Sequence, residues 1–352
     1  MSRRHVLRTG LVVALAAVAA TTMSACGSDD GGGGGGGGGG GESGGETFSV
    51  AFLAASSQNG YNKAVFEGIQ NKAEELGNVE AKILDGAFDA QVQFNQLQDA
   101  AASGQYDGIV IVPNDTVSIA GAVGAAQSAD IPVVTALFPI GPNLTQLEPQ
   151  VPGIVATVAS PPAEGARKQA ELVAEYCADK DPCRVMILIG QRQFPFDKVR
   201  YDAYRSVLDE HANIKVVATL EGNYDRDQSL KEMQDALQSN PEFDVLLSNA
   251  DQQTAGAQIA LENAGIDPKD VYLTGAGGTK EAIKAVRDGT WKADYVNFPV
   301  TQGEQALEQL VNALEGKEVK AVVDSDAEAP FDPFVDKESL EEQPDFTGQW
   351  SG

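Results

Sequence analysis

The chain has 352 residues, enough for two domains of ordinary size, and 42% of them are hydrophobic, which suits packed cores. With 51 Asp and Glu against 25 Lys and Arg, the formal net charge is -26, so we expect no nucleic-acid partner. The two histidines, His5 in the leader and His211 at a predicted helix end, leave little for a Ser–His or zinc mechanism, so we expect neither a metal nor an enzyme.

Residues 1–25 have the composition of a secretory signal peptide. Arg3, Arg4 and Arg8 precede an uncharged stretch, 11–20, that is too short for a permanent membrane helix. Residues 2–7 also resemble a twin-arginine export signal. We therefore expect the chain to be exported.

The sequence Ser24-Ala25-Cys26 resembles a bacterial lipobox, in which the cysteine is acylated and becomes the first mature residue. Met23 stands where leucine is usual. The alternative is an ordinary cleavage site with an incidental cysteine. The resemblance implies anchoring to the lipid bilayer at the outer face of the cell membrane through Cys26, followed by a glycine-rich tether over residues 26–46.

From residue 47 onward, apolar strand patterns alternate with helical ones. The predicted strands are 48–55, 79–86, 106–115, 131–138, 153–160, 184–190, 214–222, 243–250, 271–277, 292–299 and 319–325. The predicted helices are 63–77, 89–104, 116–130, 162–178, 198–211, 227–240, 254–265, 279–289 and 301–316. Such alternation with short connections predicts an α/β fold of two doubly wound, parallel-sheet lobes.

Several of these segments are similar to one known family. They include VAFLAASSQNGYNKAVFEGIQNKAEELG, YDGIVIVPND, FDVLLSNADQQTAGAQIALENAG and VYLTGAGGTKEAIKAVRDGTWKADYVNFP. From about Thr47 to Val323 the chain resembles periplasmic binding proteins of type I, the ribose- and galactose-type substrate-binding proteins of sugar ABC transporters. The resemblance implies a three-crossing hinge between a lobe of residues 47–159 plus 298–323 and a lobe of 160–297 plus 324–352, which includes a C-terminal tail.

The resemblance also implies a ligand site in the cleft between the lobes. The family's aromatic residues over the ligand match Tyr61 and Tyr224, and its ligand-donating arginine matches Arg200. The complete set of expected ligand-binding residues is Asn59, Tyr61, Phe138, Arg200, Tyr224, Asn249, Asp251 and Asn297.

The chain departs from the ribose-type pattern at three positions. Leu137 and Phe138 replace an Asp-Arg pair, and Gly277 replaces an aspartate. Because charged groups make the strong hydrogen bonds to sugar hydroxyls, their loss disfavours ribose itself. We expect a more apolar pocket, or one filled by Gln191, Phe194 and Phe196.

Structural roles compete with these ligand roles. Tyr61, Phe138 and Tyr224 are also suited to packing between the lobes. Arg200 has an alternative partner in Asp197, and Asp251 is an alternative N-cap for the helix at 254–265.

Two further motifs carry predictions. Gly275 to Thr279 resembles a dinucleotide-binding loop, but Lys280 stands at the third glycine position, and no cofactor is expected. Cys177 and Cys183 form an even pair in an exported chain, which predicts a disulfide; the alternative is two reduced thiols.

Together these patterns predict an extracytoplasmic solute-binding lipoprotein of an ABC importer, acting as a monomer with a membrane permease. The expected ligand is a sugar or polyol. The alternatives are a sensor for a membrane signalling partner, or a binder of a nucleoside or an aromatic acid. The tail aromatics Phe331, Phe334, Phe346 and Trp350 predict that the tail packs on a lobe.

Overall fold

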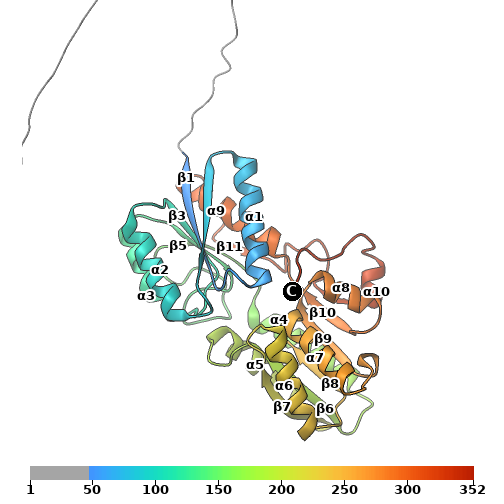
Figure 1. The fold of residues 1–352 in the computed structure, drawn as a ribbon. Coiled ribbons are helices and arrows are strands. Elements are labelled where there is room, and N and C mark those ends of the chain that lie inside the picture. The colour runs from blue at the N-terminus through green and yellow to red at the C-terminus, as the bar shows by residue number, and fades with distance from the viewer. Residues whose placement is uncertain (1–46) are drawn as a thin grey trace, which may run out of the picture. The chain divides into compact units, whose positions relative to one another are not determined.

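The computed structural model describes residues 47–352. The predicted signal peptide, Cys26 and the tether therefore lie outside the described residues. The described residues form one compact unit, which contains two six-stranded sheets (Figure 1). No helix in the described part of the chain is both long enough and apolar enough to cross a membrane.

The first sheet has the strand order β11-β5-β4-β3-β1-β2, and all its pairs are parallel. Its strands are β1 (Phe48–Ala54), β2 (Val79–Asp85), β3 (Gly108–Ile111), β4 (Val133–Leu137), β5 (Ile154–Ala159) and β11 (Val322–Asp324). Four helices cover it: α1 (Gly60–Leu76), α2 (Ala90–Ser103), α3 (Ala120–Ser128) and α9 (Pro299–Leu314). Alternate residues of β1 face opposite cores: Phe52 packs with α1 and α9, and Leu53 packs with α2 and α3.

The second sheet has the order β12-β10-β9-β8-β6-β7, with β12 antiparallel at its edge. Its strands are β6 (Cys183–Ile189), β7 (Ile214–Glu221), β8 (Val245–Ser248), β9 (Tyr272–Gly277), β10 (Ala293–Val296) and β12 (Phe334–Asp336). Helices α4 (Pro162–Tyr176) and α5 (Pro195–Leu208) cover one face, and α6 (Arg226–Ser239), α7 (Asp251–Asn263) and α8 (Lys280–Arg287) cover the other. The turn η1 (Pro268–Asp270) precedes β9, and the short helix α10 (Lys337–Glu341) follows β12.

The chain passes between the sheets three times: after β5, after β10 and after β11. The predicted fold class, two doubly wound parallel-sheet lobes, is confirmed. We propose 47–159 with 298–323, and 160–297 with 324–352, as the bounds of the first and second lobes. The end of the tail departs from this division, since Trp350 packs in a core cluster of the first lobe and Gln349 bonds to the start of α9.

In each lobe the strand order reverses beside the first strand, between β1 and β3 and between β6 and β8. Ligands of doubly wound sheets bind at such points, outside the carboxyl ends of the strands. The fold therefore brings the loops after β1, β3, β6 and β8 to one place between the lobes.

Cys177 and Cys183 form a disulfide, as predicted, with Cα atoms 5.6 Å apart. It joins the end of α4 to the start of β6. The side chain of Asn213 supports the same corner by donating to the carbonyls of Cys177 and Lys180 at 2.8 and 2.9 Å.

Candidate ligand-binding site between the lobes

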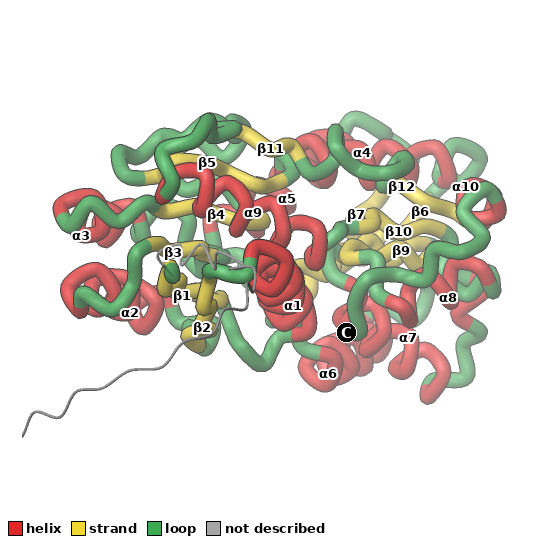
Figure 2. Tube along the Cα trace, turned by 90° about the horizontal axis from the view of Figure 1, so that it is seen from above, coloured by secondary structure: helices red, strands yellow, loops and turns green. Residues whose placement is uncertain are grey.

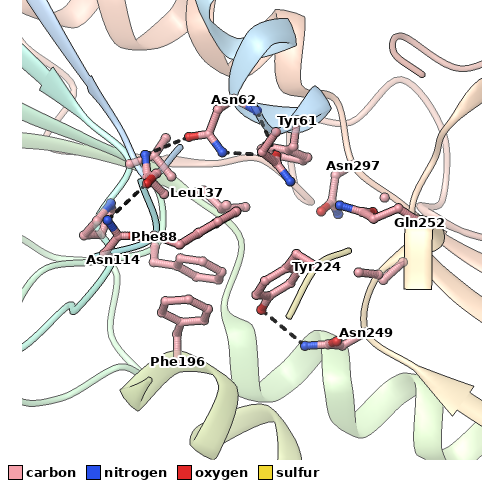
Figure 3. A pocket seen from close by; sticks show the side chains of 18 of the residues that line it. Tyr61, Asn62, Phe88, Asn114, Leu137, Phe196, Tyr224, Asn249, Gln252 and Asn297 are labelled. Carbon is pink, nitrogen blue, oxygen red and sulfur yellow. Dashed lines mark hydrogen bonds between the residues drawn. The ribbon is translucent and has the colours of Figure 1, made fainter. Parts of the chain in front are cut away.

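A cavity of about 70 Å³ lies where the loops of the two lobes meet (Figure 3). Its lining residues come from both lobes and from the tail: Ala55, Asn59, Tyr61, Asn62, Phe88, Val112, Pro113, Asn114, Leu137, Phe138, Phe196, Arg200, Tyr224, Asn249, Ala250, Gln252, Ala276, Gly277, Asn297 and Trp350. This volume is the space open to the centres of water molecules, and one water needs roughly 10–15 Å³ of it. Several waters therefore fit, which leaves room for a ligand of monosaccharide size.

A buried carboxylate organises the polar side of the second lobe. The side chain of Asp197, at the start of α5, is fully buried. Its Oδ1 accepts hydrogen bonds from Arg200 Nη2 at 2.5 Å, from the Tyr224 hydroxyl at 2.5 Å and from Asn249 Nδ2 at 2.8 Å. Its Oδ2 accepts from the backbone N–H of Gln191 at 2.7 Å. Asp197 thus fixes three side chains of the cavity wall.

Arg200 is the positively charged member of this network. Burial disfavours its cation, but Tyr224 and Asp197 more than offset that effect, so the pKa of Arg200 is raised and its charge is kept. The guanidinium also lies over the rings of Phe138 and Phe196, at 5.3 and 5.6 Å from their centroids. Its Nε is buried without a hydrogen-bond partner within the described residues.

Two aromatic pairs cross from one lobe to the other. Phe138 of the first lobe stacks on Phe196 of the second with centroids 4.1 Å apart and ring planes 13° apart. Phe88 stacks on Tyr224 at 6.0 Å and 20°. Such offset pairs bury apolar area and also have a preferred geometry. The two pairs form an apolar contact between the lobes, beside the polar network.

The first lobe contributes mainly amide side chains. Asn59 caps α1, and its Oδ1 accepts from the backbone and side-chain nitrogens of Asn62 at 3.3 and 3.2 Å. Asn114 follows β3, and its Nδ2 donates to the carbonyl of Ala55 at 3.1 Å. The Tyr61 hydroxyl donates to Gln302 Oε1 at 2.6 Å, and burial raises the pKa of Tyr61. These bonds hold the amides in fixed orientations at the cavity.

Three polar atoms at the cavity are buried and have no partner in the described part of the protein: Asn114 Oδ1, Arg200 Nε and Gln252 Oε1. Two of them are acceptors and one is a donor. Leaving such groups unpaired costs free energy, so all three atoms are available to hydrogen-bond partners in the cavity. Figure 3 shows Asn114 on one side of the cavity and Gln252 on the other.

Backbone strain gathers at the same loops. Phe88, Leu137 and Tyr224 have φ values of 53°, 70° and 57°, in the left-handed region that non-glycine residues seldom adopt. Gly277 has φ 148°, and a Cβ there would lie 2.8 Å from the ring of Trp350. A side chain at this position would therefore clash with Trp350.

Seven of the eight residues predicted to bind ligand line the cavity: Asn59, Tyr61, Phe138, Arg200, Tyr224, Asn249 and Asn297. Their contact with a ligand stays a prediction. The competing structural roles are also present, since Arg200 does pair with Asp197 and Phe138 does pack between the lobes. Of the additional candidates, Phe196 lines the cavity, whereas Gln191 and Phe194 do not.

Asp251 is the residue that the structure does not bring to the cavity. Its carboxylate is buried and accepts from the backbone N–H of Thr279 at 2.7 Å. Burial raises the pKa of Asp251 to about 6, and burial together with Asp251 raises the pKa of Asp294. The capping alternative is wrong as well, because the N-cap of α7 is Ala250 and it makes no side-chain bond.

Several lining residues were missed from the sequence. Asn114 lies three residues after the end of β3, and Gln252 lies in the first turn of α7, four residues after the end of β8, so position near a strand end was an available signal. Phe88 lies in a turn after β2 in which both Ala87 and Phe88 have the left-handed backbone, a conformation that the sequence does not announce. Trp350 comes from the tail, more than fifty residues beyond the other lining residues.

Within residues 47–352, no group of three or more His, Cys, Asp or Glu side chains is arranged to hold a metal ion. The cavity itself has amide, aromatic and guanidinium groups instead.

The family model for the periplasmic binding protein domain matches residues 50–318, more than half of the chain. This chain belongs to the periplasmic binding protein family. The family consists of non-enzymatic solute-binding proteins that work outside the cytoplasm for ABC importers.

Among curated relatives of this periplasmic binding protein, the ribose import binding protein of Bacillus subtilis is 26% identical over 78% of this chain and 85% of its own length. The D-apiose import binding protein of Actinobacillus succinogenes is 27% identical over 78% of this chain and 86% of its own. A Mycobacterium smegmatis protein solved in complex with β-D-fucofuranose has a TM-score of 0.75 and 21% identity, covering 85% of this chain and 95% of that one.

Proposed function

We propose that this periplasmic binding protein captures a neutral monosaccharide or cyclic polyol in the cavity between its lobes and delivers it to an ABC permease. The observation that carries the proposal is the cavity itself. It is small, its asparagines Asn59, Asn62, Asn114 and Asn249 are held by hydrogen bonds, and its one cation is already paired with a buried carboxylate.

The charge balance of the cavity favours a neutral ligand. Among its lining residues, Arg200 is the only one whose side chain is charged at neutral pH. That charge is paired with Asp197, whose side chain is fully buried. An aromatic acid would bring a second anion to this pair, without a further cation from the lining to accept it.

The remaining groups suit a ring that has hydroxyls at its edge and C–H groups on its faces. Asparagine and glutamine side chains both donate and accept hydrogen bonds, as hydroxyls do. The faces of Phe88, Phe138 and Trp350 offer apolar surface for the ring. A nucleoside has the same kinds of groups but is larger, so the small cavity favours a single sugar ring.

The names of the relatives support a sugar without fixing which one. The curated relatives are named for ribose and apiose, and the solved structure contains a fucofuranose. In this chain Leu137 and Phe138 stand where ribose-type proteins carry a charged pair, which argues against ribose. We therefore favour a ligand with fewer charged contacts, such as another pentose, a furanose or a cyclitol.

Hinge bending would let the ligand in and trap it. The three crossings between the lobes are the segments that can absorb such a motion. Closure would bring Phe138 onto Phe196 and place Asn114 opposite Gln252, as they are seen here. The closed form would then present both lobes to the permease.

A thermal-shift panel tests the proposal. It contains D-ribose, D-apiose, D-allose and myo-inositol, with adenosine and benzoate as the competing classes. We expect at least one of the first group, and not D-ribose most strongly, to raise the melting temperature. Stabilisation by adenosine or benzoate alone would contradict a sugar or polyol ligand.

We further propose that the protein acts as a monomer and is held at the membrane by a lipid on Cys26, which the lipobox-like sequence supports. Cells fed a radiolabelled or alkyne-tagged fatty acid should label the wild-type chain. The variant Cys26→Ala should be unlabelled and released into the medium. Equal labelling or equal retention of the two proteins would contradict the anchor.

A further inference from the structure

The C-terminal part of the chain lies beyond the family match. That match ends at residue 318, whereas the chain runs to residue 352. After β12 and α10, the C-terminal segment, residues 343–352, returns to the junction of the lobes. Both views place the C-terminus beside the start of α1 (Figures 1 and 2).

The start of the C-terminal segment is held by a charged side chain. The guanidinium of Arg287, at the end of α8, donates to the carbonyls of Leu340, Gln343 and Phe346 at 2.9, 2.6 and 2.9 Å. The ring of Phe346 packs with centroids 5.8 Å apart against that of Phe298, which stands at the crossing into α9 and is buried in a core cluster of the second lobe. Because hydrogen bonds from a charged donor are strong, this end of the segment is firmly attached to the second lobe.

The last residues bind both lobes. The backbone N–H of Lys280, in the second lobe, donates to the carbonyl of Trp350 at 2.8 Å. Gln349 bonds the start of α9 in the first lobe: its Oε1 accepts from the N–H of Val300 at 3.0 Å, and its Nε2 donates to the hydroxyl of Thr301 at 2.9 Å. The segment is thus a fourth connection between the lobes, made of hydrogen bonds.

The ring of Trp350 lies at the ligand cavity. The residue is only 4% exposed, and its ring meets that of Tyr61 edge to face at a centroid distance of 5.4 Å. Its indole N–H donates to the carbonyl of Gly277 at 2.7 Å. Since that donor is already used, the ring presents apolar surface to the cavity that it lines.

We propose that the C-terminal segment completes the ligand site: Trp350 forms an apolar wall against the bound ring, and the segment joins closure of the lobes to binding. This inference rests on the proposed function for the identity of the ligand. It assigns a specificity-determining residue to a part of the chain that the family match does not reach.

Titration calorimetry with the panel compound that most stabilises the wild type tests the wall. Trp350→Ala should bind it at least about tenfold more weakly, and Trp350→Phe should recover most of the affinity because a ring remains. Phe334→Ala is the matched control: it removes a ring of the tail that does not line the cavity, and it should bind within about twofold of the wild type. Equal affinity of Trp350→Ala and wild type would overturn the proposal.

Fluorescence gives a readout that needs no ligand. The chain has two tryptophans, Trp291 and Trp350, so Trp291→Phe leaves Trp350 as the only tryptophan. In this variant acrylamide should quench the emission poorly, because Trp350 is 4% exposed. Quenching as efficient as that of free tryptophan would overturn the proposal, whatever the ligand is.

The same variants separate the two claims. Ligand should change the emission of Trp291→Phe and leave that of Trp350→Phe unchanged; the reverse would overturn the role of Trp350. If no sugar or polyol binds the wild type, the proposed function fails. The affinity comparison then uses adenosine or benzoate, whichever stabilises the protein. If neither does, acrylamide quenching alone tests the place of Trp350.

Discussion

The two lobes build their sides of the cavity differently. The second lobe has a polar network in which the buried Asp197 fixes Arg200, Tyr224 and Asn249. The first lobe brings amides and the ring of Phe138 instead. Unpaired buried atoms occur on both sides among the described residues: Asn114 Oδ1 in the first lobe, and Arg200 Nε and Gln252 Oε1 in the second.

We infer from this difference that the two lobes have different roles in ligand binding. A preassembled polar network needs little rearrangement when a ligand arrives, so the second lobe is suited to receiving the ligand first. The first lobe has apolar surface from which water is displaced when the lobes close. We expect substitutions in the second lobe to affect stability and binding together, and those in the first lobe to affect mainly binding.

The largest effect should come from Asp197→Asn. It removes the buried charge that balances Arg200, and breaking a buried pair costs about 3–5 kcal/mol. Urea unfolding should show this loss, and binding should be lost with it. The double variant Asp197→Asn, Arg200→Met should be more stable than the single one. An unchanged free energy of unfolding in Asp197→Asn would show that Asp197 does not stabilise the second lobe.

The buried carboxyls Asp251 and Asp294 give the second lobe a pH dependence. Because burial raises the pKa of Asp251 to about 6, above that of the unfolded chain, the folded state binds more protons between about pH 4 and 6. The contribution of Asp251 to stability is therefore present at acid pH and is lost as the pH rises through about 6. The free energy of unfolding of Asp251→Asn minus that of the wild type should be about 1–3 kcal/mol larger at pH 8 than at pH 5.

Urea unfolding of both proteins at pH 5 and pH 8 measures that difference. The overall charge of the two proteins differs by only one unit, so repulsion across the acidic surface nearly cancels in the comparison. Parallel stability profiles for wild type and Asp251→Asn would contradict the raised pKa of Asp251.

In the first lobe, Asn114→Ala should weaken binding of the stabilising panel compound by about tenfold, since it removes an amide oxygen that a ligand hydroxyl would pair. Calorimetry measures this. The matched control is Asn95→Ala on α2, an exposed amide outside the cavity, which should bind as the wild type does. Equal losses in the two variants would show that Asn114 has no special role.

The smallest effect should be the coupling between Phe138 and Phe196 across the lobes. A double-mutant cycle with alanine, read from unfolding with the stabilising panel compound at saturation, should give about 0.5–1.5 kcal/mol. A coupling energy of zero would mean that the stacked pair does not hold the lobes together in the closed, ligand-bound form.

The fold could be predicted because the alternation of strands and helices is strongly periodic. Buried strands such as β1 and β6 are continuous apolar runs, and capping residues such as Asp89 and Gly77 mark helix ends. The position of the cavity followed from the same pattern, since strand-end residues such as Asn59 and Asn249 had to meet there.

The rest depended on packing that no local pattern encodes. Asp251 looked like a strand-end ligand residue, but its side chain turns to the backbone of Thr279. Phe88 reaches the cavity only through its left-handed backbone, and Trp350 only through the course of the tail. Long-range contacts of this kind are visible only once the chain is folded.

The central claim, a neutral sugar or polyol held between the lobes, is tested most directly by a crystal structure of the protein with the panel compound that most raises its melting temperature. The account predicts density for one ring in the cavity, with hydroxyls bonded to Asn114 and Arg200 and a ring face against Trp350. Density at another place, or a ligand held through an anionic group at Arg200, would contradict it.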